Sequence, residues 1–156
     1  MSPLKRQFFL EYGKMEWNSD ESTLWLYVDS EENVFVSEVG NSRITKWSPP
    51  SYSQRIVVAG TGTAGVDPKQ LNYPTALTID GKGNLYTADT DNHRIQKWSP
   101  PYTKGITFVD KTGAPGFSAN KLNQPSSVKL DSTQTYVYIC DRGNNRVQKF
   151  TLSQCP

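Results

Sequence analysis

The chain of 156 residues is long enough for one ordinary domain. It contains 11 Gly, 10 Pro and an aromatic set of 4 Trp, 8 Tyr and 6 Phe, a mixture that favours short strands joined by tight turns. The net charge of +2 neither requires nor excludes a nucleic-acid partner. No apolar run approaches the roughly 18 residues of a transmembrane helix, and residues 1–7 lead into no apolar core of a secretory signal, so we expect no membrane partner and leave the compartment open.

One pattern recurs along most of the chain. Residues 1–21 match no full unit of it, and they form either outer strands of an incomplete unit, with residues 5–10 as one such strand, or an irregular segment. Three units follow, at approximately residues 22–72, 73–123 and 124–152, before a short C-terminal tail. Their landmarks are Asp29, Asp80 and Asp131, the turn Ser48-Pro49-Pro50 that returns as Ser99-Pro100-Pro101, and Leu71-Asn72-Tyr73-Pro74 that returns as Leu122-Asn123-Gln124-Pro125.

The middle unit shows what each repeat builds. Its sequence predicts four short strands, at residues 77–79, 85–89, 94–98 and 106–109, separated by turns that contain glycine, asparagine or proline. Alternate side chains point to opposite faces, Tyr86 and Ala88 to one and Leu85 and Thr87 to the other, so both faces are apolar. Such a sheet suits a position between two similar sheets, and we predict an all-β fold, a partial β-propeller of about three four-stranded antiparallel blades.

The run from Asn84 to Trp98, above all Asn92-His93-Arg94-Ile95, resembles the NHL repeat. Residues 140–150 fit nearly as well, whereas the first unit departs from the pattern at Glu38 and Ser42 and has Thr23 in place of a proline. NHL repeats are known to form six-bladed rings, so the resemblance implies half a ring. An open half leaves two apolar faces exposed to water, so other blades are expected to cover them. We expect a fragment of a larger propeller, because residues 1–21 look cut and not capped. A self-completing dimer is the next alternative, and an unrelated chain that supplies the other blades is the third.

Acidic and basic side chains recur in fixed places. The pairs Asp89–Arg94 and Asp141–Arg146 are expected to be structural, since an active site is needed once and not in successive blades. The aspartates at 29, 80 and 131 each begin a turn and are expected to cap its N–H groups. His93 is the only histidine and is expected to face solvent in a turn, so we predict no metal, no cofactor and no catalytic residue. Residues 60–65 have the glycines of a phosphate loop without its ending and read as an ordinary loop.

Two cysteines make neither a disulfide framework nor a metal site. We expect Cys140 to be a small buried side chain within a strand and Cys155 to be a loose thiol beside the C-terminus.

A binding surface is the better use of this architecture. Because strands alternate in direction, the turns between the second and third strands of all units gather at one end. We expect a polar rim there that binds a protein or peptide, formed by Asn41, Ser42, Asp91, Asn92, His93, Arg142, Asn144 and Asn145. The alternatives are half of a propeller enzyme of the lyase or lactonase kind, with its catalytic residues on absent blades, and an RNA-binding NHL domain, which would prefer a more basic rim with exposed aromatics.

Overall fold

The computed structural model of the protein describes residues 24–154, so the expectations for residues 1–21 and for Cys155 lie outside it. The described chain forms three antiparallel sheets of consecutive strands, here called blades 1, 2 and 3. Their strands are, in blade 1, β1 (Leu24–Val28), β2 (Val34–Glu38), β3 (Arg43–Trp47) and β4 (Arg55–Ala59); in blade 2, β5 (Pro74–Ile79), β6 (Leu85–Asp89), β7 (Arg94–Trp98) and β8 (Gly105–Val109); and in blade 3, β9 (Pro125–Leu130), β10 (Tyr136–Asp141) and β11 (Arg146–Thr151).

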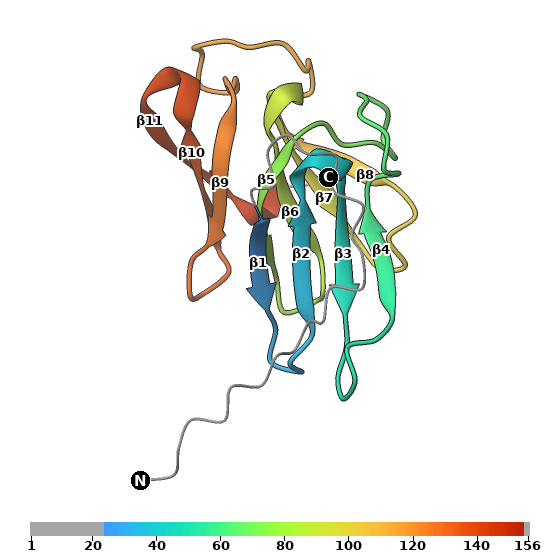
Figure 1. Ribbon diagram of the computed structural model, residues 1–156. Coiled ribbons are helices and arrows are strands. Elements are labelled where there is room, and N and C mark those ends of the chain that lie inside the picture. The colour runs from blue at the N-terminus through green and yellow to red at the C-terminus, as the bar shows by residue number, and fades with distance from the viewer. Residues whose placement is uncertain (1–23, 155–156) are drawn as a thin grey trace, which may run out of the picture.

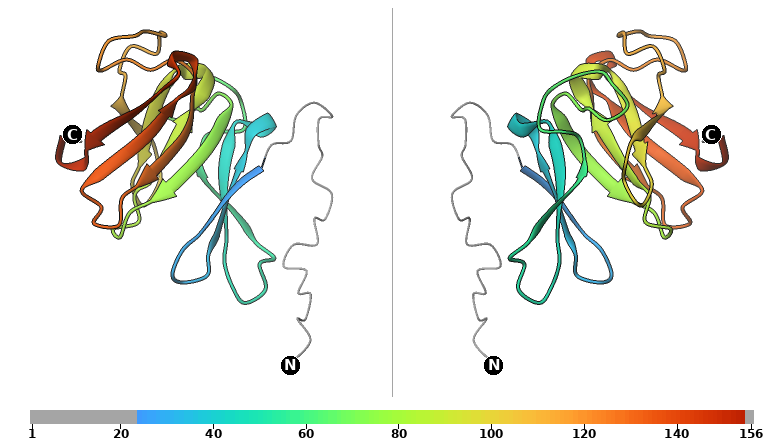
Figure 2. Two further views of the ribbon diagram at one scale, coloured as in Figure 1. Left: turned by 90° about the vertical axis from the view of Figure 1, so that its left-hand side faces the viewer. Right: turned by 90° about the vertical axis from the view of Figure 1, so that its right-hand side faces the viewer.

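The blades stand side by side, as the splayed sheets in Figure 2 show, and their first strands β1, β5 and β9 are neighbours. This confirms the predicted partial β-propeller, with one difference. Within residues 24–154, blade 3 has three strands, and β11 lacks the outer partner that β3 finds in β4 and β7 finds in β8. No helix in the same range is long and apolar enough to span a membrane.

The turn that begins each first hairpin is held by its aspartate, as predicted. In blade 2 the Oδ1 atom of Asp80 accepts the backbone N–H groups of Lys82 and Asn84, both at 2.9 Å, while Gly83 takes a positive φ of 80°. Asp29 and Asp131 accept N–H groups of their own turns in the same way. The three aspartates are therefore turn caps.

The turn between the second and third strands takes a form that the sequence pattern did not predict. It is a short 3-10 helix in every blade, followed by one residue in the left-handed conformation whose N–H closes the turn. These helices are η1 (Val39–Asn41), η2 (Thr90–Asn92) and η3 (Arg142–Asn144), a fourth, η4 (Leu152–Gln154), follows β11, and the left-handed residues after η1, η2 and η3 are Ser42, His93 and Asn145.

Two apolar cores lie between the blades, one on each face of blade 2. Leu85 and Trp98 pack in the core shared with blade 1, whereas Tyr86, Ala88 and Ile95 pack in the core shared with blade 3. Neighbouring positions of β6 thus point to opposite faces, as the period of two requires. All five residues of β6 are buried, because the strand is covered from both sides.

Cys140 corrects one expectation. The sequence placed it among buried apolar residues, but the side chain is exposed. Its equivalents in blades 1 and 2, Ser37 and Ala88, are fully buried because the next blade covers them. Cys140 points from the face of blade 3 that no other blade covers within residues 24–154, so its exposure follows from its position in the row of blades.

We expect Leu85→Ala to lower the free energy of unfolding by about 2–5 kcal/mol, because it empties part of the core between blades 1 and 2. Urea unfolding followed by circular dichroism measures the change. Val66→Ala is the matched control: Val66 is 68% exposed in a loop, so its loss should stay within about 0.5 kcal/mol. Equal losses in the two variants would contradict the assignment of Leu85 to a packed interface between blades.

Candidate functional site

A buried carboxylate marks the end of the second strand in each blade. Asp89 and Asp141 are fully buried, and Glu38 is 2% exposed. The arginine that opens the next strand pairs with it: Nε of Arg94 lies 2.7 Å from Asp89, and Nε of Arg146 lies 2.8 Å from Asp141. The predicted ion pairs are confirmed, and each joins two neighbouring strands at their common end.

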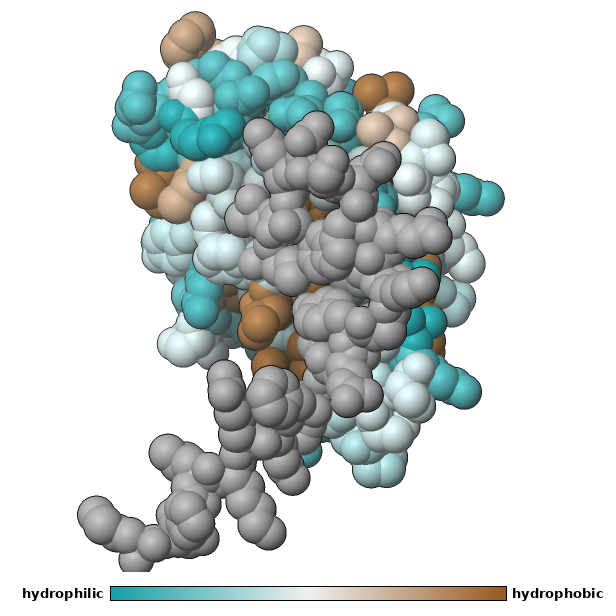
Figure 3. All heavy atoms as spheres, in the orientation of Figure 1, coloured by the Kyte–Doolittle hydropathy of each residue, from teal (hydrophilic) through white to brown (hydrophobic). Residues whose placement is uncertain are grey.

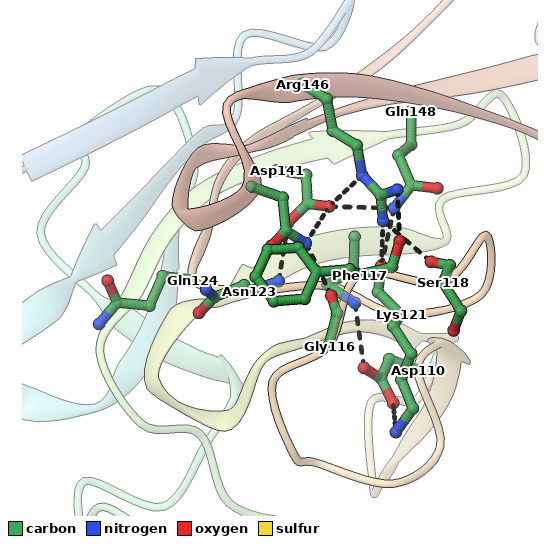
Figure 4. Close-up of polar contacts among 12 residues, drawn as sticks. Asp110, Gly116, Phe117, Ser118, Lys121, Asn123, Gln124, Asp141, Arg146 and Gln148 are labelled. Carbon is green, nitrogen blue, oxygen red and sulfur yellow. Dashed lines mark hydrogen bonds and ion pairs between the residues drawn. The ribbon is translucent and has the colours of Figure 1, made fainter.

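The rest of each guanidinium holds a loop. We call this end of the blades, uppermost in Figure 1, the rim; it carries η1, η2, η3 and the loops 60–73 and 110–124. In blade 3, Arg146 donates from Nη1 to the carbonyl of Phe117 at 2.8 Å and from Nη2 to the carbonyls of Ser118 and Lys121, both at 2.9 Å (Figure 4). In blade 2, Arg94 donates to the carbonyl of Val66 at 2.8 Å. Arginines at equivalent positions therefore fix equivalent loops in the two blades.

An asparagine completes the attachment. Asn144 donates to Asp141 at 2.9 Å and to the carbonyl of Gly116 at 2.7 Å, and Asn92 repeats both bonds with Asp89 and the carbonyl of Gly65. The other carboxylate oxygen accepts a backbone N–H from the end of the loop. The N–H of Asn72 donates to Asp89 at 2.6 Å, and the N–H of Asn123 donates to Asp141 at 2.7 Å. Each rim loop is thus held through its backbone at both ends by one buried ion pair.

Equivalent carboxyls in the two blades have opposite pKa shifts. Burial raises the pKa of Asp89 above its ordinary value of 3.8, against the hydrogen bonds from Asn72, Asn92 and Arg94. Burial also acts to raise the pKa of Asp141, but there the hydrogen bonds prevail and the pKa lies below 3.8. The cause is position, since blade 2 is covered on both faces and blade 3 is covered on one.

The loops present apolar side chains to solvent at equivalent positions. Val66 follows Gly65 and is 68% exposed; Phe117 follows Gly116 and is 78% exposed. Arginine holds their backbone carbonyls, so the exposed side chains take no part in the attachment. The rim predicted from the sequence does not include Val66 or Phe117. The signal was the glycine followed by an apolar residue, 51 positions apart in successive repeats.

The structure brings the predicted rim residues to one end of the molecule, with different surroundings. Asp91, Arg142 and Asn145 are exposed; Asn41, His93 and Asn144 are partly buried; Ser42 and Asn92 are buried. The amides of Asn92 and Asn144 are engaged in the loop attachment described above, and that of Asn41 donates to Glu38 at 3.1 Å. The side chains open to a ligand are accordingly those of Asp91, Arg142 and Asn145.

The structure corrects the expectation that His93 faces solvent, because its side chain is partly buried. Its Nδ1 accepts the backbone N–H of Gln124 at 3.1 Å, so it joins the rim of blade 2 to the strand entry of blade 3. Partial burial between blades explains the difference. Among residues 24–154, no three His, Cys, Asp or Glu side chains gather as ligands for one metal ion.

These sheets and their repeated carboxylate–arginine attachment define the chain as a row of β-propeller blades. A family model described as NHL repeat matches residues 71–98. NHL repeat-containing protein 3 from Homo sapiens is 33% identical over 131 aligned residues, which cover 77% of this chain and 35% of that protein. The chain belongs to the NHL-repeat family, and it spans about a third of the length of this relative.

Two further matches concern an enzyme and a solved structure. Peptidyl-alpha-hydroxyglycine alpha-amidating lyase 2 from Drosophila melanogaster is 28% identical over 100 residues, covering 63% of this chain and 25% of the lyase. The crystal structure of an auxiliary nutrient binding protein from Bacteroides thetaiotaomicron VPI-5482 aligns with a TM-score of 0.67 and 18% identity, over 81% of this chain and 36% of that one. At this identity the structural likeness concerns the fold.

We expect Asp89→Asn to lower the free energy of unfolding by about 3–5 kcal/mol, because it leaves the buried guanidinium of Arg94 without a counter-charge. Asp141→Asn should lower it by about 1–3 kcal/mol, because the side chain of Arg146 is more exposed, 32% against 10%, and retains water. Urea unfolding at neutral pH measures both. Asp91→Asn, on the exposed rim, serves as the control, and equal losses at positions 89 and 141 would contradict the role given to burial.

The lowered pKa of Asp141 predicts a pH dependence of stability. A carboxyl with a folded pKa below its unfolded one stabilises the fold above the unfolded pKa, and this contribution is lost as the pH falls through the folded pKa. The difference in unfolding free energy between the natural chain and Asp141→Asn should therefore be full near neutrality and shrink as the pH falls below 3.8. Urea titrations at several pH values measure it, and a difference that widens in acid would contradict the assignment.

Proposed function

We propose that the rim of this NHL-repeat chain binds a protein or peptide through the two loops that present Val66 and Phe117. The observation that carries the proposal is the exposure of these apolar side chains on loops whose backbones are fixed. A phenylalanine exposed to 78% contributes little to the packing of its own chain. On a partner's surface, an aromatic side chain of this kind is a typical centre of binding energy.

The attachment of the loops favours binding. Arg146 and Asn144 hold the backbone on both sides of Phe117, so the loop loses little conformational freedom when a partner docks. The same rim carries exposed polar side chains, among them Arg142 and Asn145, that can pair with groups of the partner. Figure 3 shows the same mixture, a largely hydrophilic upper end with separate apolar patches.

RNA is the weaker candidate for this rim. Single-stranded RNA is bound by basic surfaces on which aromatic rings stack the bases. Phe117 and Arg142 suit that chemistry, but Asp91 places a negative charge on the rim of blade 2 and Val66 offers no ring. Two exposed apolar side chains on a rim that carries charges of both signs suit a peptide better than RNA.

An enzymatic role is the second candidate, and the similarity to the Drosophila lyase favours it. Among residues 24–154, no three His, Cys, Asp or Glu side chains gather as metal ligands, and the pairs Asp89–Arg94 and Asp141–Arg146 fix loops. In this alternative the catalytic groups belong to blades outside the described chain, and the rim would bind the substrate peptide.

The test is selection of a displayed library of random peptides on the immobilised chain. We expect peptides that bind the natural chain at least about tenfold more tightly than Phe117→Ser or Val66→Ser, which corresponds to about 1.4 kcal/mol or more. Both variants should unfold at the same urea concentration as the natural chain, since the two side chains are exposed. Fluorescence anisotropy of the selected peptides measures the affinity.

A matched control and two further probes make the outcome decisive. Val28→Ser removes an apolar side chain that is 52% exposed and lies opposite Val34, at the end of blade 1 farthest from the rim, and should leave the peptide affinity unchanged. Peptides that bind all variants alike would contradict the proposal. Binding of a labelled random-sequence RNA with loss in Phe117→Ser would favour RNA, and turnover of a peptide that ends in α-hydroxyglycine would favour the lyase.

A further inference from the structure

One face of blade 3 has the side chains that blades 1 and 2 bury beneath the next blade, but no blade covers it within residues 24–154. Ile44 in blade 1 and Ile95 in blade 2 are fully buried beneath the next blade, whereas the equivalent Val147 is 66% exposed. Tyr86 is 2% exposed, and its equivalent Tyr138 is 39% exposed. The third blade therefore presents the side chains that the first two use to hold a following blade.

Blade 1 carries the complementary face. Leu77 and Ile79 of blade 2 are buried against blade 1, at 2% and 8% exposure. The equivalent residues of blade 1, Leu26 and Val28, are 63% and 52% exposed. In Figure 3, which looks onto this side of the molecule, apolar surface is visible over β1. An exposed apolar patch of this kind marks an interaction surface.

An unpaired strand edge accompanies the open face of blade 3. Within residues 24–154, β11 pairs with β10 alone. A cavity of about 370 Å³ lies beside it, lined in part by Phe108, Val109, Phe150 and Thr151. The residue equivalent to Phe108 in blade 1 is Val58, which is 2% exposed, so a complete outer strand closes this space between blades 1 and 2. An edge of this form accepts an added strand.

The chain itself contains a sequence suited to that edge. The sequence of residues 6–10 is Arg-Gln-Phe-Phe-Leu, which compares with Arg-Ile-Val-Val-Ala in the outer strand β4 and Gly-Ile-Thr-Phe-Val in the outer strand β8. In blades 1 and 2 the outer strand is followed by 14 residues (60–73) or 15 residues (110–124) before the next blade begins. Thirteen residues (11–23) separate residues 6–10 from β1. This spacing is one or two residues shorter than the other two and suits an outer strand of the blade that precedes blade 1.

We propose that two copies of this chain form a closed pair, in which blade 3 of each copy packs against blade 1 of the other and residues 6–10 of each add to β11 of the other. Each contact repeats the interface already seen between blades 1 and 2. Two such contacts related by a two-fold axis cover all four open faces and both strand edges. The 110–124 loop borders the cavity beside β11, but Phe117 is not among the residues that line it, and Val66 lies on the other rim loop. The rim proposal therefore does not depend on this pairing.

The experiment combines sedimentation equilibrium with the reactivity of Cys140. In a Cys155→Ser background Cys140 is the one remaining thiol of the sequence, and it lies on the open face of blade 3. We expect a species of about 35 kDa, twice the 17.5 kDa chain, at micromolar concentration. Maleimide labelling of Cys140 should slow by about tenfold or more as the protein concentration passes through the dissociation constant.

Three substitutions test the geometry. Val147→Glu places a charge on the open face of blade 3 and should shift the equilibrium to a folded monomer with a reactive Cys140. Phe9→Asp should weaken the pair by about tenfold or more by removing an apolar side chain from the added strand. Val66→Glu adds the same charge at a similarly exposed site on the rim, 68% against 66%, and should leave the pair intact.

The outcomes decide the proposal. A folded monomer with a reactive Cys140 at high micromolar concentration would overturn it, as would a dimer that Val147→Glu leaves unchanged or in which Cys140 stays fully reactive. A dimer indifferent to Phe9→Asp would overturn the assignment of residues 6–10 to β11. Loss of peptide binding in the rim variants with the pair intact would separate the two proposals.

Discussion

The structure depends on burying a carboxylate at the end of each second strand. An ionised carboxylate away from water is tolerated only when hydrogen-bond donors surround it. Asp89 meets this condition with the guanidinium of Arg94, the amide of Asn92 and the backbone N–H of Asn72. These donors come from the neighbouring strand, the intervening turn and the incoming loop. Satisfying one charge therefore fixes three parts of the blade together.

This constraint connects the fold to the rim. The guanidinium has five N–H donors in a planar fork, and the carboxylate uses only part of them. Arg146 places the remaining donors on the carbonyls of the 110–124 loop. A loop held through its carbonyls does not need its side chains for attachment, so Phe117 is free to face solvent. The groups that stabilise the blade and those available to a partner are thus the backbone carbonyls and the side chains of the same loop residues.

The sequence predicted what is local and repeated. Strands, the turn caps at Asp29, Asp80 and Asp131, and the pairs Asp89–Arg94 and Asp141–Arg146 all follow from spacing within one unit. Features that depend on the neighbouring unit could not be predicted from a single repeat. Cys140 has the strand context of a buried residue, as Ala88 does, but burial requires a following blade. His93 appeared exposed because its partner, the N–H of Gln124, lies in the next blade.

Comparing the blades with one another shows where recognition can vary. Positions of the attachment are the same in blades 2 and 3, with Asp, Asn and Arg at 89, 92 and 94 and again at 141, 144 and 146. The glycines at 65 and 116 and the leucines at 71 and 122 that bound the loop are also the same, and each glycine N–H bonds its leucine carbonyl at 3.1 Å. Between them the side chains differ, from Val66 to Phe117 and from Asp67 to Ser118. Because the attachment contacts only their backbone, these positions accept different side chains without loss of the fold, and a row of such blades can present a different surface at every loop.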